Sequence, residues 1–284
     1  MKHLFLGIAV WLVGSVVTAQ GFEPMPRVHY VHFPSLDAAR PLTVAAQLRL
    51  PPASAGAKLP AVVIVHGSAG VDSRGSLYAQ ALNRVGIATL EIDMWAARGF
   101  IGGLSRPRGV PETLPDAFGA LKYLAERPEL DAARIGIMGF SWGGVVSMLS
   151  ATAPYTEQYL GRTLRFAAHA PLYPVCWVYN AVPGYDFRAF TGAPVLIQAG
   201  ALDTYDDPDT CSRLVQGLNN PSITARVYPG ATHAWDRLEP EIRVNDPFAH
   251  KGRGGEVVFT PNPRVAQESV QATVGFFRQV FGLR

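Results

Sequence analysis

The stretch Gly139-Phe140-Ser141-Trp142-Gly143 places a serine between two glycines, where a strand-like apolar run meets a helix-like apolar run. The G-x-S-x-G spacing is typical of a sharp strand-to-helix turn that exposes a nucleophilic hydroxyl. A serine hydroxyl is a weak nucleophile at neutral pH, so this chemistry also needs a base. Small residues that let a helix pack closely on a sheet would give the same local pattern.

An aspartate and a histidine later in the sequence could supply the base and the group that orients it. Asp203 follows the apolar run 195–199, and His233 follows the apolar run 224–228. A histidine titrates near neutral pH and can accept the serine proton, while a carboxylate can orient the imidazole. The order Ser, Asp, His is the order of a hydrolase triad on a parallel sheet. We therefore interpret Ser141, Asp203 and His233 as a candidate triad.

The developing charge on a substrate carbonyl would need hydrogen-bond donors. We expect these to be the backbone N–H groups of Trp142 and of Ser68, which lies in the His66-Gly67-Ser68-Ala69-Gly70 loop after the run 61–65. Each residue alone has a structural alternative. Asp203 could cap the following helix, although Asp206, Asp207 and Asp209 are better placed for capping. Asp206 and Asp207 are also rivals for the acid role.

The elements that must position these residues follow one format. Short apolar strand-like runs occur at 28–33, 42–50, 61–65, 87–92, 134–138, 166–169, 195–199 and 224–228. Helix-like stretches lie at 76–84, 113–126, 143–150, 209–218 and 264–281. Alternation of this kind predicts an α/β fold with a mostly parallel central sheet and helices on both faces. The segment 245–263 is rich in Gly, Pro and charge, and a plain surface loop is favoured there over a lid.

Several side chains near strand ends are candidate substrate contacts. The tryptophans in question are Trp95, Trp142, Trp177 and Trp235, and the arginines are Arg98, Arg106 and Arg108. Aromatic rings would suit an apolar acyl or aryl group, and arginine could meet a carboxylate. The alternatives are loop anchors for the rings and solvated surface charge for the arginines. His29 and His32 have no carboxylate spaced with them as a ligand set, and no nucleotide-type phosphate loop is present, so we expect neither a metal nor a cofactor.

The N-terminal residues 1–19 have the form of a secretory signal, with Lys2 near the start, an apolar run and small residues before a cleavage site after Ala19. We expect residues 20–284 to form one catalytic domain, periplasmic or secreted, that has no membrane segment after cleavage. The formal net charge is +3, and the Lys and Arg residues are scattered along the chain, which argues against a nucleic-acid partner. An oxidising compartment would favour a disulfide between Cys176 and Cys211, although two free thiols remain an alternative.

From about Val28 to the C-terminus, the chain resembles the dienelactone hydrolase family of α/β-hydrolases. The matching pieces are AVVIVHGSAG, DMWAARG, IGIMGFSWGG, LYPVCW, VLIQAGALDTYDDPDTC, YPGATHAWD and VAQESVQATVGFF. The resemblance implies an α/β-hydrolase fold with Ser141, Asp203 and His233 in the triad positions. The founding enzymes of the family use a cysteine nucleophile and a glutamate in the loop after the third strand. Here those positions hold Ser141 and the HGSAG loop, which favours a serine esterase relative.

The leading hypothesis is therefore a serine hydrolase that cleaves small-molecule carboxylic esters or lactones through an acyl-enzyme. A serine peptidase or amidase on the same fold is an alternative, but no propeller or cap domain is visible in the sequence. A non-catalytic binding protein that retains the fold is a second alternative, and the complete set of triad residues argues against it.

Overall fold

An eight-stranded sheet dominates the computed structural model, which describes residues 25–54 and 56–283. The strand order is β1-β2-β4-β3-β5-β6-β7-β8. The β1–β2 and β2–β4 pairs are antiparallel, and all later neighbours are parallel. The strands are β1 (Arg27–Pro34), β2 (Thr43–Leu50), β3 (Leu59–Val65), β4 (Ala88–Asp93), β5 (Leu130–Phe140), β6 (His169–Leu172), β7 (Val195–Gly200) and β8 (Ile223–Tyr228).

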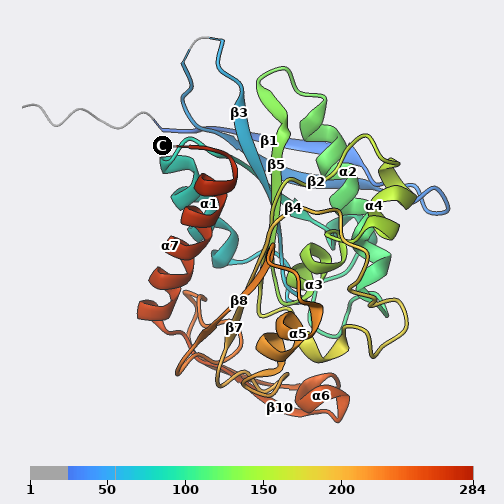
Figure 1. Cartoon of the computed structure of the whole chain (residues 1–284), viewed down its shortest axis with the longest axis vertical. Coiled ribbons are helices and arrows are strands. Elements are labelled where there is room, and N and C mark those ends of the chain that lie inside the picture. Colours follow the sequence, from blue (N-terminus) through green and yellow to red (C-terminus); the bar gives the residue numbers. More distant parts are fainter. Residues whose placement is uncertain (1–24, 55, 284) are drawn as a thin grey trace, which may run out of the picture.

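Helices cover both faces of the sheet (Figure 1). On one face lie α1 (Ser73–Arg84) and α7 (Pro263–Val280), and on the other lie α2 (Leu114–Ala125), α3 (Trp142–Leu149), α4 (Ala153–Leu160) and α5 (Thr210–Leu218). The central strand β3 is buried at all seven residues, because both of its faces are covered. The predicted mostly parallel sheet with helices on both faces is confirmed.

Helix starts are set by local capping. Asp72 accepts a hydrogen bond from the N–H of Arg74, so α1 begins three residues before the predicted start at residue 76. Asn262 likewise accepts from the N–H of Val265 at the start of α7. In both cases the cap lies just outside the apolar pattern that indicated the helix.

Two elements differ from the prediction. Strand β6 runs to Leu172, whereas the sequence predicted 166–169, because Pro171 within the strand weakens the strand signal. Helix α4 was not predicted, because Thr156 is its only buried residue and its apolar periodicity is weak.

The segment 245–263 is not the plain loop that was favoured. It contains most of a hairpin in which β9 (Ile242–Asp246) pairs antiparallel with β10 (Gly255–Phe259), and the short α6 (Ala249–Gly252) lies between them. Glycine, proline and charge obscured the alternation in the sequence, and this hairpin borders the site described below.

No helix within residues 25–54 and 56–283 is long and apolar enough to span a bilayer. The predicted signal segment 1–19 lies outside the described residues.

Candidate active site

Ser141 occupies the turn between β5 and α3 with φ 52° and ψ −107°. Positive φ is costly for a serine and persists only where the surroundings enforce it, which is common at functional sites. The surroundings here are close backbone contacts. A Cβ atom at Gly143 would collide with the carbonyl oxygen of Val65, and one at Gly139 would collide with that of Gly143. The flanking glycines therefore allow the turn that presents the Ser141 hydroxyl.

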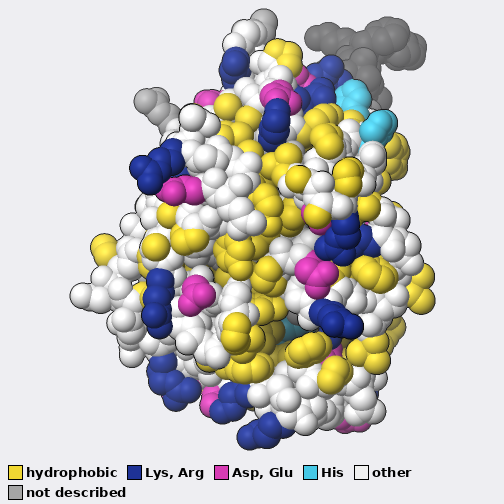
Figure 2. Space-filling view, turned by 90° about the vertical axis from the view of Figure 1, so that its right-hand side faces the viewer, with side chains coloured by type: hydrophobic (Ala, Val, Ile, Leu, Met, Phe, Trp, Pro, Cys, Tyr) yellow, Lys and Arg dark blue, Asp and Glu magenta, His cyan; other side chains and the backbone are white. Residues whose placement is uncertain are grey.

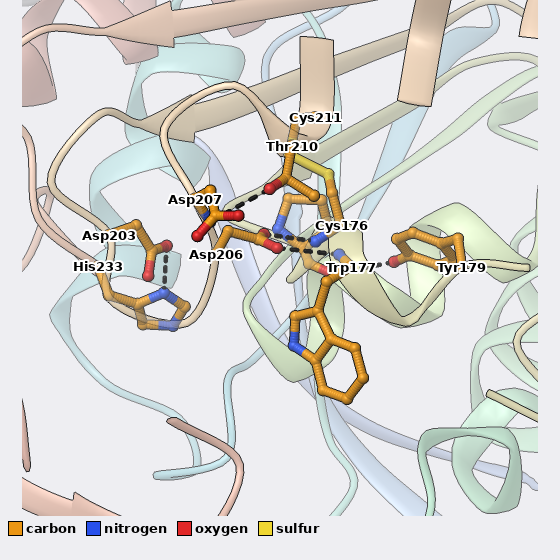
Figure 3. Close-up of a disulfide and its surroundings, with 10 residues drawn as sticks. Cys176, Trp177, Tyr179, Asp203, Asp206, Asp207, Thr210, Cys211 and His233 are labelled. Atoms are coloured by element: carbon orange, nitrogen blue, oxygen red, sulfur yellow. Dashed lines mark hydrogen bonds and ion pairs between the residues drawn. A yellow bond between two sulfur atoms is a disulfide. The ribbon is translucent and has the colours of Figure 1, made fainter. Parts of the chain in front are cut away.

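Asp203 and His233 lie in the loops after β7 and β8 and are joined by a hydrogen bond. His233 Nδ1 is 2.7 Å from Asp203 Oδ2, and both side chains are almost completely buried (Figure 3). This bond leaves Nε2 as the ring nitrogen available to a substrate or nucleophile. The second carboxylate oxygen of Asp203 accepts the N–H of Tyr205, which fixes the carboxylate.

Ser141 and His233 line one cleft of about 480 Å³, called here the large cleft. Among the described residues, the Ser141 hydroxyl and the His233 ring are not hydrogen bonded to each other. Such bonds often tighten only when substrate binds. The arrangement therefore brings the three predicted residues to one cleft, with the base already oriented by its acid.

The two expected oxyanion donors also border the site. Gly67 O accepts the N–H of Gly70 at 3.0 Å and lies 2.7 Å from His66 Nδ1. Because the C=O and N–H of one trans peptide point in opposite directions, these contacts fix the direction of the Ser68 N–H. Trp142 is the first residue of α3, where N–H groups have no partner within the helix. Within the described part of the chain, neither of these two N–H groups has a hydrogen-bond partner.

The side chains of His66 and Trp95 hold the loop that contains Ser68 in place. His66 Nε2 accepts the N–H of Met94 at 3.0 Å, so the ring must be neutral with its proton on Nδ1. Burial lowers the pKa of His66 to about 4, which favours this neutral form. Trp95 donates its indole N–H to Ser68 O at 3.1 Å and is buried. The expected substrate contact of Trp95 is therefore wrong: its ring supports the loop.

Two other expected substrate contacts are also wrong. Arg98 forms a buried ion pair with Asp116, with 2.5 Å between Nη1 and Oδ2. Trp235 is fully buried and donates its indole N–H to Ser269. Neither side chain lines a cavity at Ser141, because both face the protein interior.

Trp177, Arg106 and Arg108 do border the site. With Ser141 and Ser68, they line a second cavity of about 90 Å³, called here the small cavity. Hydrophobic side chains gather in a band down the face of the molecule seen in Figure 2. Trp142 also lines the small cavity, and its indole N–H is bonded to Thr113 Oγ1.

A disulfide joins Cys176, in the short 3₁₀ helix Cys176–Val178, to Cys211 in α5, with 5.1 Å between the Cα atoms. Asp206 lies beside it and accepts the N–H groups of Cys176 and Trp177 (Figure 3). Burial and the nearby Asp203 raise the pKa of Asp206 to about 7. Cys176, Cys211 and Asp206 lie close enough together to suggest a metal site, but sulfurs bonded to each other offer no thiolate.

Three residues of the site were missed or only partly anticipated. Asp246 of the hairpin accepts a hydrogen bond from the Tyr205 hydroxyl at 2.9 Å and forms an ion pair with Arg106 at 3.3 Å. These partners lie 41 and 140 residues away in sequence, so no local pattern could reveal the contact. For Arg106 the sequence suggests a substrate contact or solvated surface charge, but not this contact with the hairpin.

With this geometry in place, the family can be stated. The chain matches the model of the dienelactone hydrolase family over residues 44–281, and it belongs to that family. An uncharacterized protein of Mycobacterium tuberculosis is 30% identical over 64% of this chain and 66% of its own length. The match thus spans just under two thirds of that relative. A Bradyrhizobium protein named "Probable 2-oxo-3-(5-oxofuran-2-ylidene)propanoate lactonase" is 25% identical over 63% of this chain and 74% of its own.

Solved structures share the fold. A dienelactone hydrolase-like promiscuous phosphotriesterase from metagenomic libraries has a TM-score of 0.59 at 18% identity, covering 90% of this chain and 99% of that one. EstE1, a thermophilic carboxylesterase from a metagenomic library, has a TM-score of 0.59 at 16% identity, covering 92% and 91%. These likenesses establish an α/β-hydrolase fold, and the family supports hydrolase activity.

Proposed function

We propose that this protein is a serine hydrolase that cleaves carboxylic ester or lactone bonds through an acyl-enzyme. The observation that carries the proposal is the buried 2.7 Å hydrogen bond between Asp203 and His233 in the cleft that Ser141 also lines. A buried carboxylate bonded to a histidine, in the same cleft as a serine with positive φ, is the arrangement that a hydrolase triad requires. The esterase and lactonase names among the relatives support the same reaction class.

The residues would act in sequence. His233 Nε2 takes the proton of the Ser141 hydroxyl as Oγ attacks the carbonyl carbon. The resulting oxyanion receives hydrogen bonds from the N–H groups of Ser68 and Trp142. His233 then gives the proton to the leaving oxygen, the C–O bond breaks, and Ser141 carries the acyl group. A water molecule, activated by the same histidine, releases the acid. In a lactone, the leaving hydroxyl stays tethered to the acyl group by the carbon chain throughout, so the product is a single hydroxy acid.

The proposed setting is the periplasm or the extracellular space. The signal-like pattern of residues 1–19 supports export, and the Cys176–Cys211 disulfide is the kind of bond that an oxidising compartment preserves. The proposed partner is a small-molecule ester, and the scattered charge gives no reason to add a nucleic acid.

The test combines labelling with turnover. The protein is treated with a fluorophosphonate and examined by peptide mass spectrometry, and hydrolysis of p-nitrophenyl esters is measured for the wild type and Ser141→Ala. We expect an adduct on Ser141, and a loss of kcat of about 10⁶-fold in the variant. The matched control is Ser54→Ala at an exposed serine, which should retain full activity. Ordinary activity in Ser141→Ala, or an adduct on another residue, would refute the proposal.

A further inference from the structure

Two cavities of different chemistry meet at Ser141. Ser141 and Ser68 line both the small cavity and the large cleft, whereas His233 lines only the large cleft. We propose that the small cavity binds the acyl group and the large cleft binds the alcohol, so that the substrates are esters of short apolar acids with neutral, hydroxyl-bearing alcohols. This inference rests on the proposed function and specifies its substrate class.

The position of His233 sets the orientation. In the proposed reaction the histidine must deliver a proton to the leaving alcohol oxygen, so that oxygen has to lie on the histidine side of Ser141. His233 faces the large cleft. The acyl chain lies on the other side of the carbonyl carbon, and the small cavity is the space that Ser141 borders there.

The small cavity suits a short apolar chain. Its walls include Val145, Val178, Trp177 and Phe248, which offer hydrocarbon or aromatic surface. Its volume of about 90 Å³ is less than a fifth of the 480 Å³ of the large cleft, so it favours a short acyl chain such as butyryl over a long one such as octanoyl.

The large cleft suits a neutral polar group. Three ion pairs line it. Asp72 pairs with Arg74, their closest atoms 2.5 Å apart, Arg237 pairs with Glu239 at 3.5 Å, and Arg106 pairs with Asp246 at 3.3 Å. The charges within each pair cancel, so the cleft has no excess charge to attract an ion. The same groups present both donors and acceptors, which is what a hydroxyl group requires. At about 480 Å³ the cleft has room for a glycerol or a sugar.

A wall built from two loops and the β9–β10 hairpin lies between the two compartments. Arg106, Tyr205 and Asp246 line both cavities and are joined by the ion pair and hydrogen bond described above. The Arg106 guanidinium lies over the rings of Trp142 and Phe248, 5.6 and 5.1 Å from their centroids. Contacts on several sides hold this wall in place, so the two parts of an ester meet different surroundings.

The test uses four esters: glyceryl monobutyrate, glyceryl monooctanoate, hexyl butyrate and hexyl octanoate. Their kcat/KM values are measured by pH-stat titration. We expect the wild type to favour butyryl over octanoyl by about tenfold or more, and glyceryl over hexyl by a similar factor. Trp177→Ala enlarges the small cavity, so the butyryl-to-octanoyl ratio should fall about tenfold, with the glyceryl-to-hexyl ratio unchanged. Val178→Ala is a milder variant that should shift the same ratio in the same direction.

The matched variant for the large cleft is Asn245→Leu, which makes an exposed position in that cleft apolar. It should lower the glyceryl-to-hexyl ratio and leave the acyl ratio unchanged. The inference would be overturned if Trp177→Ala changed the glyceryl-to-hexyl ratio and Asn245→Leu the butyryl-to-octanoyl ratio, or if the four esters were cleaved without preference. An adduct on Ser141 would still support the proposed function in that case. Absence of both turnover and adduct would instead remove the proposed function, and this inference with it.

Discussion

The carboxylates after β7 differ in what they touch. Asp203 is bonded to His233, whereas Asp206 turns toward the backbone N–H groups of Cys176 and Trp177 (Figure 3). Asp207 forms a surface ion pair with Lys251. Position in the sequence placed all three near the site, but only the fold shows which one meets the histidine. The acid role therefore falls to Asp203 in our proposal.

We predict that Asp203→Asn lowers esterase kcat by about 10⁴-fold, because an amide cannot hold the imidazole in the required tautomer. Asp206→Asn should lower it by less than about tenfold, because that side chain stabilises a turn and not the base. Steady-state kinetics on p-nitrophenyl butyrate, with circular dichroism to verify folding, gives the comparison. A severe loss in Asp206→Asn beside a mild one in Asp203→Asn would reverse the assignment.

The pKa of His66 leads to a prediction about acid stability. Its ordinary value is 6.5 and its folded value is about 4, so between these pH values the unfolded chain binds a proton that the folded chain does not. This contribution to the free energy of unfolding is complete above pH 6.5 and declines by about 3 kcal/mol as the pH falls through 4. In His66→Gln the decline should be absent.

Urea unfolding of the wild type and His66→Gln at several pH values from 7 to 4 measures this difference. The gap between the two stabilities should narrow as the pH falls. A gap that stays constant across this range would show that His66 is not held neutral by the fold. His169 is a useful comparison, because burial lowers its pKa to about 3 while it lies outside the candidate site.

The elements that the sequence could predict are helices with strong apolar periodicity and strands that are buried. The run 61–65 and the turn at Ser141 were both identified from the sequence, because buried parallel strands and the G-x-S-x-G turn have distinctive residue patterns. The β9–β10 hairpin was missed because glycine, proline and charged residues obscure its strand alternation, and the contacts of Asp246 with Tyr205 and Arg106 join residues far apart in sequence. Trp95 and Trp235 follow strand ends as a substrate contact would, and burial is decided by tertiary packing that position alone does not reveal.

The hairpin gives a prediction at the scale of the element. Asp246→Ala removes the counter-charge of Arg106 and the acceptor of the Tyr205 hydroxyl, so the wall between the two cavities should loosen. We expect KM for small esters to rise about tenfold, because misplaced binding groups cost orientation. Cleavage by protease within 242–259 should also accelerate.

Kinetics and timed limited proteolysis of Asp246→Ala test this, with Asp209→Ala as the control at an exposed aspartate in an ion pair with Arg213. Unchanged KM and unchanged proteolysis of Asp246→Ala would mean that the hairpin is held by its other contacts.

At the scale of the whole molecule, the disulfide connects the 3₁₀ helix Cys176–Val178 to α5, beside the site. Cys176 precedes Trp177, which lines the small cavity, and Cys211 lies in the helix after the Asp203 loop. The sequence could supply the pairing only as an expectation from cysteine count and export. Whether two loops meet depends on strand order, and here β6 and β7 are neighbours in the sheet. That adjacency brings both cysteines to the same edge.

We predict that the double variant Cys176→Ser and Cys211→Ser loses about 4 kcal/mol of stability, because the bond closes a loop of 35 residues in the unfolded chain. For a chain of this size the melting temperature should fall by about 10 °C. Differential scanning calorimetry of the double variant, and of wild type with and without reductant, measures it. The wild type should show no free thiols when denatured without reductant. Two free thiols per chain, or a melting temperature that reductant leaves unchanged, would contradict both the bond and its use as support for export.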